Sequence, residues 1–335
     1  MLPRIKVTLI TYSTCFLATV VLSIGAWNSY TNESIPTEEE PAPSAKTAKP
    51  ATTKTILLWS DLYKSRDWAF GFGEMPFRQQ CPGSGKCRTT ADRAELANAD
   101  AVVFHIAHMQ ATLGQSQTLG DLLPARGKPG QVYVFWNHEP PLEGRRSSLT
   151  GLRGVFNVTI TYRPDSTIYL PLHKIERLST PTAAPNASYI MAKKTDLACW
   201  VVSACQKSHS HRNEYAEELS ASMDFDVYGK CGNLTCPSDG MGCFEELSVR
   251  YKFYFAFENS YCRDYITEKP FRTLKNNWVP IVLGASNYSA HLPPKSFIDV
   301  RDFYSPKSLA QYLRYLDQND DKYMEYLQSK RFFFL

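Results

Sequence analysis

The chain has 335 residues, of which 43% are hydrophobic and 21% are charged. This length suggests about two domains, because a domain usually takes ~100–200 residues. The net charge is only +4, which argues against a nucleic-acid partner, since nucleic-acid-binding surfaces are strongly basic. A small basic groove for an anion is still compatible with this charge.

The first predicted element is an apolar helix over residues 7–27, which contain no charged side chain. About 20 helical residues are enough to cross the apolar layer of a bilayer. Arg4 and Lys6 precede the segment and acidic residues follow it. The positive-inside rule therefore predicts a cytoplasmic tail at 1–6, a signal anchor at 7–27 and a lumenal remainder. A cleaved signal peptide is the alternative, because Ile24-Gly25-Ala26 resembles a cleavage site.

The cysteines and glycosylation sequons also indicate a lumenal compartment. Of nine cysteines, Cys15 lies in the apolar segment, and the even number that remains suggests disulfide bonds. Zinc is the alternative for Cys231, Cys236 and Cys243, although their spacing fits zinc ligands poorly. Five Asn-x-Ser/Thr triplets, the acceptors of N-glycans, support the secretory route: Asn32, Asn157, Asn186, Asn233 and Asn287.

Residues 28–54 are rich in Pro, Thr, Ala and Glu, which predicts an extended stem without a core. Anchor, stem and folded lumenal part together predict a single-pass type II protein of the Golgi membrane. Beyond the stem, strand-like and helix-like segments alternate, which predicts an α/β architecture with parallel sheets. The strand candidates are 56–59, 101–106, 132–136, 157–162, 198–203, 253–257 and 280–284. The helix candidates are 89–99, 211–223, 269–277, 305–318 and 319–330.

A polar, proline-containing stretch at 176–196 separates two such groups and is interpreted as a linker. It predicts an N-terminal domain over 55–180 and a C-terminal domain over 195–335. In open parallel sheets, ligands bind outside the carboxyl ends of the strands. Two facing α/β domains would therefore place a ligand cleft between them.

Three segments carry candidate functional residues. The stretch VYVFWNHEPP ends an apolar strand and places Glu139 at its mouth, where burial could make it a general base; a turn-capping glutamate is the alternative. Ser203 ends the strand at 198–203, and Arg212 then opens a helix. A helix start with an arginine suits a phosphate or diphosphate, and an exposed arginine is the alternative.

The stretch DYITEKPF follows the apolar run FYFAFENS and brings Tyr265, Glu268 and Lys269 within five residues. Such side chains suit a ligand with an aromatic ring, hydroxyls and anionic oxygens. Thr267 is the predicted N-cap of the next helix, and Pro270 predicts that this helix starts one or two residues later.

Two acidic or histidine pairs resemble metal sites but are predicted to be inert. Asp224 and Asp226 form an Asp-x-Asp pair that arises easily by chance. His105 and His108 would point to opposite faces of a strand.

The stretch KFYFAFENSYCRDYITEKPFRTLKNNWVPIVLGASNY, followed by LPPKSFIDVRDFYSPKSLAQYLRYLD, closely resembles the donor-binding region of the Golgi α1,3-fucosyltransferases, glycosyltransferase family 10. WVVSACQKSHSHRNEYAEEL looks like an upstream part of that region, and VYVFWNHEPP with FNVTITYRPDSTIYLP is similar to the acceptor-side domain. The resemblance covers about residues 55–330. It implies a GT-B fold, two Rossmann-like domains that face a cleft, with GDP-fucose as donor. It also implies no obligatory metal, a divalent cation being a stimulator at most.

The resemblance further implies an inverting transfer of L-fucose to the 3-hydroxyl of an N-acetylglucosamine in a glycan. By position, Glu139 matches the catalytic base, and Arg212 and Lys269 match the groups that hold the diphosphate. Tyr265 and Glu268 match donor contacts, and Ser203 lies beside the nucleotide pocket.

The chain also departs from the family pattern. It has Ala204 where Asn is usual, Ala107-His108 where Arg-Asp is common, and an end at YLQSKRFFFL where relatives continue through a helical segment with a cysteine pair. The C-terminal domain is therefore predicted to be shortened. An inactive or truncated paralogue that retains glycan or partner binding is the alternative function.

Overall fold

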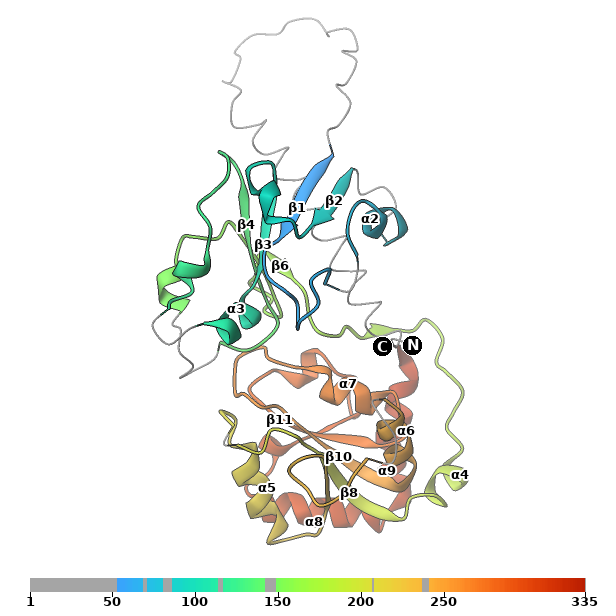
Figure 1. The fold of residues 1–335 in the computed structure, drawn as a ribbon. Helices are drawn as coiled ribbons and strands as arrows, with labels where there is room; N and C mark the ends of the chain where they lie inside the picture. Colours follow the sequence, from blue (N-terminus) through green and yellow to red (C-terminus); the bar gives the residue numbers. More distant parts are fainter. Residues whose placement is uncertain are drawn as a thin grey trace, which may run out of the picture. The chain divides into compact units, whose positions relative to one another are not determined.

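The computed structural model describes residues 53–68, 71–80, 86–113, 117–141, 149–206, 208–236 and 241–334. The predicted tail and anchor, and the stem through residue 52, lie outside these residues. Within the described part, the structure has no helix of the length and apolar character that a membrane crossing requires. The chain divides between Leu170 and Pro171 into two compact units, here called the N-terminal and C-terminal units (Figure 1).

The N-terminal unit is built on a six-stranded parallel sheet with the order β2-β1-β3-β4-β5-β6. Its strands are β1 (Lys54–Leu58), β2 (Cys87–Thr90), β3 (Ala101–His105), β4 (Val132–Asn137), β5 (Val158–Thr161) and β6 (Ile168–Tyr169). In the described part of this unit the helices and 3-10 turns are α2 (Met75–Gln80), η1 (Arg93–Ala97), α3 (Ile106–Thr112), η2 (Gly120–Leu122) and η3 (Leu149–Leu152). Side chains on alternate positions of one strand enter different apolar clusters, Ile56 on one face and Leu57 on the other. Burial on both faces explains why these strands are continuous apolar runs.

The C-terminal unit has a five-stranded parallel sheet with the order β12-β11-β10-β8-β9. Its strands are β8 (Asp196–Val201), β9 (Asp226–Tyr228), β10 (Tyr251–Phe257), β11 (Val279–Leu283) and β12 (Ile298–Asp299). One face packs against α5 (Arg212–Ser220), α8 (Pro306–Asp317) and α9 (Asp320–Ser329). The other packs against α6 (Met241–Arg250) and α7 (Glu268–Leu274). Helices therefore cover both faces of this sheet (Figure 1).

The strand order reverses once in each sheet. In the C-terminal unit the chain runs from β8 outward to β9 and then crosses to β10 on the other side of β8. In the N-terminal unit it runs from β1 to β2 and then crosses to β3. Loops diverge at such a switch point and leave a crevice at the carboxyl ends of the two central strands. Each unit therefore has one topologically favoured place for a ligand.

All seven strand candidates are confirmed, but some helix predictions were wrong. The helix expected over 89–99 is reduced to η1 because Thr89 and Thr90 are buried in strand β2, and β-branched side chains suit a sheet. His108 does not share a strand with His105, because β3 ends at His105 and α3 begins at once. Pro270 does not delay α7, which starts at Glu268, since a first-turn proline lacks only an N–H that no helical carbonyl would accept.

Two predicted helix starts are confirmed. Ser305 is the N-cap of α8 and forms a reciprocal capping box with Ser308. Asn319 occupies the N-cap position of α9.

Disulfide bonds join Cys205 to Cys231 and Cys236 to Cys243. The prediction of disulfides is thereby confirmed, and the three cysteines considered for zinc are all engaged in these bonds.

The segment predicted as a linker contains β7 (Glu176–Arg177) and α4 (Ala187–Met191), both in the C-terminal unit. The last described residues form η6 (Lys330–Phe332) and β13 (Phe333–Phe334), and β13 pairs with β7 in antiparallel fashion. The end of the chain therefore packs onto the start of its own unit.

Candidate functional site

Arg212 lies at the switch point of the C-terminal sheet. It is the first residue of α5, only 4% exposed, and its Nη1 donates to the carbonyl of Phe257 at the end of β10, 3.1 Å away. Its Nε is buried without a hydrogen-bond partner among the described residues. The sequence left open an exposed arginine here, and the structure instead holds a buried guanidinium with unused donors. Burial lowers the pKa of Arg212 and Glu258 acts in the opposite direction, but an arginine stays charged.

Glu258 directly follows β10 and is fully buried. Its carboxylate accepts hydrogen bonds from the backbone N–H of Thr267 at 2.8 Å, from the Thr267 hydroxyl and from the Lys269 ammonium at 2.9 Å. Lys269 Nζ also donates to Thr267 Oγ1 at 2.7 Å. A buried carboxylate is tolerated only when it is paired and hydrogen-bonded in this way. Glu258 thus ties the first turn of α7 to the end of β10.

Tyr265 and Glu268, the two other candidate residues of the stretch DYITEKPF, have different environments. Tyr265 is 2% exposed, and its hydroxyl donates to Asn259 Oδ1 at 3.2 Å, so its ring presents little surface to a ligand. Glu268 is half-buried and lies 3.7 Å from Arg272. Burial acts to raise the pKa of Glu268, but Lys269 and Arg272 outweigh it and leave the pKa below its ordinary value. Glu268 is therefore an ionised acceptor suited to sugar hydroxyls.

Ser203 is exposed in the loop after β8. It lies against Gly229, where the backbone has φ +90°, and a Cβ there would lie 3.1 Å from Ser203 Oγ and 2.6 Å from the Val202 carbonyl. Glycine is required at this position on both counts. The structure therefore brings Arg212, Lys269, Glu268 and Ser203 to one carboxyl edge of one sheet.

Glu139 lies in the N-terminal unit, just beyond the end of β4. Its backbone is held by Asn137, whose Nδ2 donates to the Glu139 carbonyl at 2.9 Å and whose Oδ1 accepts from the Glu139 N–H. Tyr63 donates its hydroxyl to Glu139 Oε1 at 2.9 Å. Among the described residues, the half-buried carboxylate has a hydrogen-bond partner for Oε1 alone, and Oε2 is the oxygen that would accept from another group. The Glu139 carboxylate is thus held by the Tyr63 hydroxyl, whereas a turn-capping glutamate, the alternative from the sequence, would accept from a turn backbone N–H.

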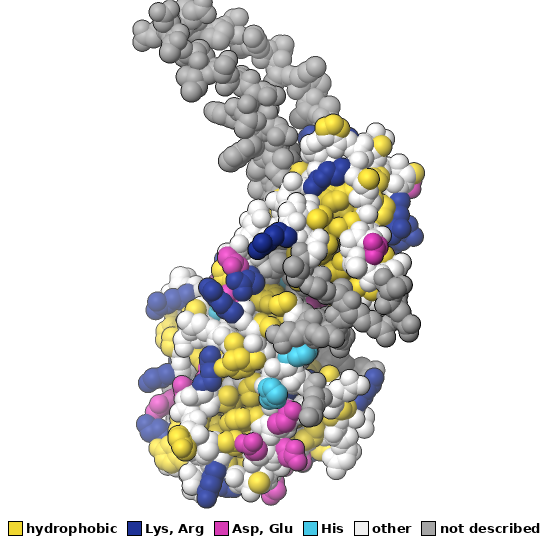
Figure 2. Space-filling model, turned by 90° about the vertical axis from the view of Figure 1, so that its left-hand side faces the viewer, with side chains coloured by type: hydrophobic (Ala, Val, Ile, Leu, Met, Phe, Trp, Pro, Cys, Tyr) yellow, Lys and Arg dark blue, Asp and Glu magenta, His cyan; other side chains and the backbone are white. Residues whose placement is uncertain are grey.

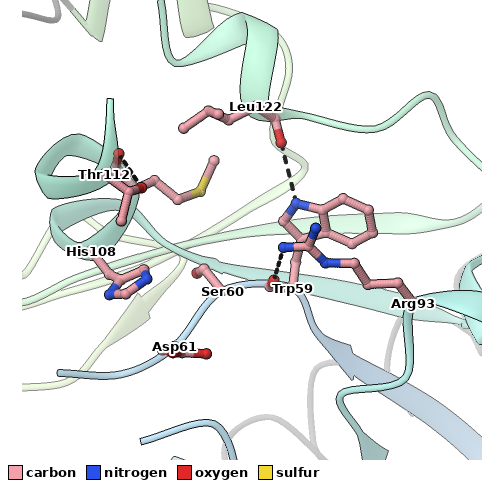
Figure 3. Close-up of a pocket in the computed structure, with 8 residues that line it drawn as sticks. Trp59, Ser60, Asp61, Arg93, His108, Thr112 and Leu122 are labelled. Carbon is pink, nitrogen blue, oxygen red and sulfur yellow. Dashed lines mark hydrogen bonds between the residues drawn. The ribbon is translucent and has the colours of Figure 1, made fainter. Parts of the chain in front are cut away.

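A pocket of about 330 Å³ opens at the switch point of the N-terminal sheet. Trp59 and Asp61 from the loop after β1 line it, together with His108 from α3. The Arg93 guanidinium lies 4.3 Å over the Trp59 ring and donates to the Trp59 carbonyl at 3.2 Å. Figure 3 shows His108 on one side of the pocket and the stacked Trp59 and Arg93 on the other. A carboxylate, an imidazole and a guanidinium around a space of this size suit the hydroxyls of a sugar.

In the acidic pair Asp224–Asp226, the carboxylate of Asp226 is engaged within the fold. Asp226 lies in β9 and accepts a hydrogen bond from the hydroxyl of Tyr251. Among the described residues, no group of three or more His, Cys, Asp or Glu side chains is arranged to hold a metal ion.

The surface in Figure 2 shows Lys and Arg side chains scattered over one face among hydrophobic and acidic ones. Arg212 differs from such surface cations in being buried, and Lys269 differs in being bound to the buried Glu258.

Sequence reasoning missed Glu258, Tyr63 and the lining of the pocket. A signal for Glu258 was present, because a glutamate that directly follows a seven-residue buried strand must find partners if it is buried too. No comparable signal marks Tyr63, which is distant in sequence from Glu139.

Comparisons with known proteins agree with this arrangement. The model "Fucosyltransferase, N-terminal" matches residues 51–173, and "Glycosyltransferase family 10 (fucosyltransferase) C-term" matches residues 191–334. A human 4-galactosyl-N-acetylglucosaminide 3-alpha-L-fucosyltransferase, FUT5, is 40% identical over 82% of this chain and 69% of its own. Alpha-(1,3)-fucosyltransferase C of Drosophila melanogaster is 34% identical over 82% of this chain and 68% of its own.

The fold is also similar to solved structures. A crystal structure of an alpha1,3-fucosyltransferase with GDP-fucose superposes with a TM-score of 0.53 at 17% identity, and the match covers 87% of this chain and 86% of that one. The two parallel-sheet domains therefore correspond to a known fucosyltransferase fold. Because family models match both units and curated relatives match most of the chain, the chain belongs to glycosyltransferase family 10, the fucosyltransferases.

Proposed function

We propose that this chain is an α1,3-fucosyltransferase that moves L-fucose from GDP-fucose to the 3-hydroxyl of an N-acetylglucosamine in a glycan. One observation carries the donor half of this proposal. Arg212 and Lys269 are bound to the consecutive residues Phe257 and Glu258, so both cations lie at one switch point. Two cations with unused N–H donors suit a diphosphate, which is bound best by charge-assisted hydrogen bonds. The linkage is supported by the relatives, which are α1,3-fucosyltransferases by name, and the donor by the similar crystal structure, which contains GDP-fucose.

The chemistry of the donor side follows from charge. As the bond from fucose to the diphosphate breaks, negative charge grows on the leaving GDP. Fixed cations at that point stabilise the transition state more than the ground state, which is the condition for catalysis. Arg212 and Lys269 would take this role, and Glu268 would accept hydrogen bonds from fucose hydroxyls. Ser203 would contact the nucleotide, and Tyr265 would support the loop that carries Glu268 and Lys269.

The acceptor side is assigned to the N-terminal unit. Glu139 would accept the proton of the acceptor 3-hydroxyl as that oxygen attacks the sugar carbon. Attack opposite the departing GDP inverts the configuration from the β-linked donor to an α-linked product, by the logic of an inverting glycosidase with a hydroxyl in place of water. The pocket at Trp59, Asp61 and His108 would hold part of the acceptor. This division of labour is the GT-B arrangement, which we propose for the domains at 55–180 and 195–335.

The cellular setting is proposed from the sequence. A signal anchor at residues 7–27 would make the protein a type II component of the Golgi membrane, with both units in the lumen. The two disulfide bonds are consistent with such an oxidising compartment.

The test is a transfer assay. The purified chain is incubated with labelled GDP-fucose and a panel of N-acetyllactosamine and chitobiose acceptors, and the product linkage is determined by NMR. An α1,3-linked fucose on at least one acceptor is expected. Glycan binding without transfer to any acceptor would contradict the proposal and support the inactive paralogue instead.

A further inference from the structure

We infer that Glu258 is a positioning residue for donor binding, which acts by fixing the direction of the Lys269 ammonium. The inference rests on the proposed function, because it takes Lys269 as a group that binds the diphosphate. It adds a residue to which neither the sequence nor the comparisons assign a role.

An ammonium has three N–H bonds in a tetrahedral arrangement and rotates easily at the end of a flexible side chain. Lys269 uses one of them for Glu258 Oε2 at 2.9 Å and one for Thr267 Oγ1 at 2.7 Å. Two fixed bonds determine the direction of the third. The Lys269 side chain is partly open, 22% exposed, and under the inference the remaining N–H is the one that meets the ligand. The ammonium of Lys269 is therefore oriented before an anion binds.

Glu258 can hold this geometry because it is itself immobile. Its side chain is fully buried, its N–H donates to the Leu283 carbonyl at 2.9 Å, and its carbonyl accepts from the Ser210 hydroxyl. Both carboxylate oxygens are engaged by Thr267. The space beside it is tight, since a Cβ added to Gly284 would lie 3.4 Å from Glu258 Cγ and 2.4 Å from Tyr288 Oη.

The same residue links the two cations. Ser210, in the loop before α5, donates to the carbonyl of Glu258, and Arg212, the first residue of α5, donates to that of Phe257. Lys269, in the first turn of α7, binds the carboxylate of Glu258. The end of β10 is therefore the common support of both groups assigned to the diphosphate.

A purely electrostatic role and a positioning role of Glu258 predict opposite changes in GDP affinity when its charge is removed. Glu258 carries a negative charge next to the site of an anion, so its removal as a charge alone would strengthen GDP binding. If instead it positions Lys269, its removal weakens GDP binding because the ammonium loses its orientation. The sign of the change in affinity therefore separates the two roles.

The experiment is a double-mutant cycle on GDP affinity with the purified full chain, measured by calorimetry. Glu258→Gln keeps the shape of the side chain, and we expect it to raise the Kd for GDP about tenfold, as loss of a charge-assisted hydrogen bond does. In a Lys269→Met background, Glu258→Gln is expected to cause no further change, because a residue that acts through Lys269 has nothing left to position. In steady-state kinetics, Glu258→Gln should raise the KM for GDP-fucose and leave that for the acceptor unchanged.

The matched control is Asp100→Asn in the N-terminal unit. Asp100 also accepts a backbone N–H, from Thr55, and pairs with the ammonium groups of Lys54 and Lys128. Asp100→Asn should leave GDP affinity unchanged, which would show that the loss of a paired carboxylate alone does not weaken GDP binding. If Glu258→Gln does not fold, Thr267→Val tests the orientation of Lys269 instead. It removes the hydroxyl that binds both Lys269 and Glu258 and changes no charge, so the Kd for GDP should rise, and an unchanged Kd would overturn the inference.

Each outcome decides between the possibilities. A Kd that is unchanged or lower in Glu258→Gln, or an equal fold-change with and without Lys269, would overturn the inference. A wild-type chain that transfers fucose while Lys269→Met binds GDP normally would also overturn it and leave the proposed function intact. A wild-type chain that neither binds GDP nor transfers fucose would instead refute the proposed function.

Discussion

Replacement of Arg212 by lysine tests whether the buried guanidinium meets the diphosphate. The substitution keeps the positive charge but replaces five N–H donors spread over a planar group with three at one point. In the native protein one nitrogen, Nη1, already serves the Phe257 carbonyl at 3.1 Å, and Nε has no partner among the described residues. Arginine can offer Nη1 to the carbonyl and a different nitrogen to a phosphate oxygen, whereas lysine has a single nitrogen on a side chain of another length. We therefore expect at least one of the two hydrogen bonds to be lost.

The size of the effect follows from the loss of that bond. A hydrogen bond to a charged ligand contributes about 1.5–3 kcal/mol, so the Kd for GDP should rise by roughly 10- to 150-fold. If the ammonium moves to the ligand instead, the Phe257 carbonyl loses its donor and folding stability falls by about 1–3 kcal/mol. Calorimetry with GDP and a thermal unfolding curve measure both quantities on the same sample. The two effects should trade against each other, because one ammonium serves both.

The control is Arg250→Lys. Arg250 ends α6 and pairs with Asp196, the first residue of β8, so it lies at the amino edge of the same sheet. It should leave GDP affinity unchanged. If Arg212→Lys binds GDP as tightly as the wild type and is equally stable, Arg212 does not have the proposed role.

Four further predictions can be checked independently. Glu139→Gln should abolish transfer while GDP affinity stays nearly intact, since the amide cannot accept the hydroxyl proton; normal turnover would remove Glu139 from its role. His108→Ala should raise the KM for the acceptor and not that for GDP-fucose, because His108 lines the N-terminal pocket; the reverse pattern would exclude the pocket from acceptor binding. Burial lowers the pKa of His105, His138 and His173 from 6.5 to about 4, so only the unfolded chain takes up these protons between those values. The free energy of unfolding, measured by urea titration, should therefore fall as pH is lowered from 7 to 5, by up to about 2 kcal/mol for each histidine, and a constant free energy of unfolding would contradict this. The Cys205–Cys231 bond joins residues 26 apart and the Cys236–Cys243 bond residues 7 apart. Replacing both cysteines by serine should therefore lower the free energy of unfolding by about 3.5 kcal/mol for the first bond and about 2.4 kcal/mol for the second, measured by thermal unfolding. Equal losses would show that loop length does not set the cost.

Much of the fold could be predicted because it depends on local patterns. Strands such as β3 and β10 are buried on both faces and appear in the sequence as uninterrupted apolar runs. The starts of α8 and α9 were predicted at Ser305 and Asn319; Ser305 caps α8 through its side chain, whereas Asn319 holds the N-cap position of α9 with no side-chain cap hydrogen bond. Short elements were missed where tertiary packing decides. The strand β2 exists because Thr89 and Thr90 are buried beside β1, which no local pattern indicates.

The candidate site divides in the same way. Glu139, Arg212 and Lys269 stand out because each follows an apolar strand or opens a helix. What holds them in place is contributed by distant residues, and spacing in the sequence carries no information about it. Tyr63 lies 76 positions from Glu139, and Arg212 lies 45 positions from Phe257. The burial of Arg212 was likewise hidden, because an arginine in a first helical turn is equally compatible with an exposed surface.

The most direct measurement is a crystal structure of the full chain with GDP-fucose bound. The account predicts that the diphosphate oxygens accept hydrogen bonds from Arg212 and Lys269 at the end of β10. It also predicts that the fucose hydroxyls contact Glu268, with Glu139 on the side of the sugar opposite the diphosphate. A donor bound elsewhere, with both cations directed away from it, would contradict the account.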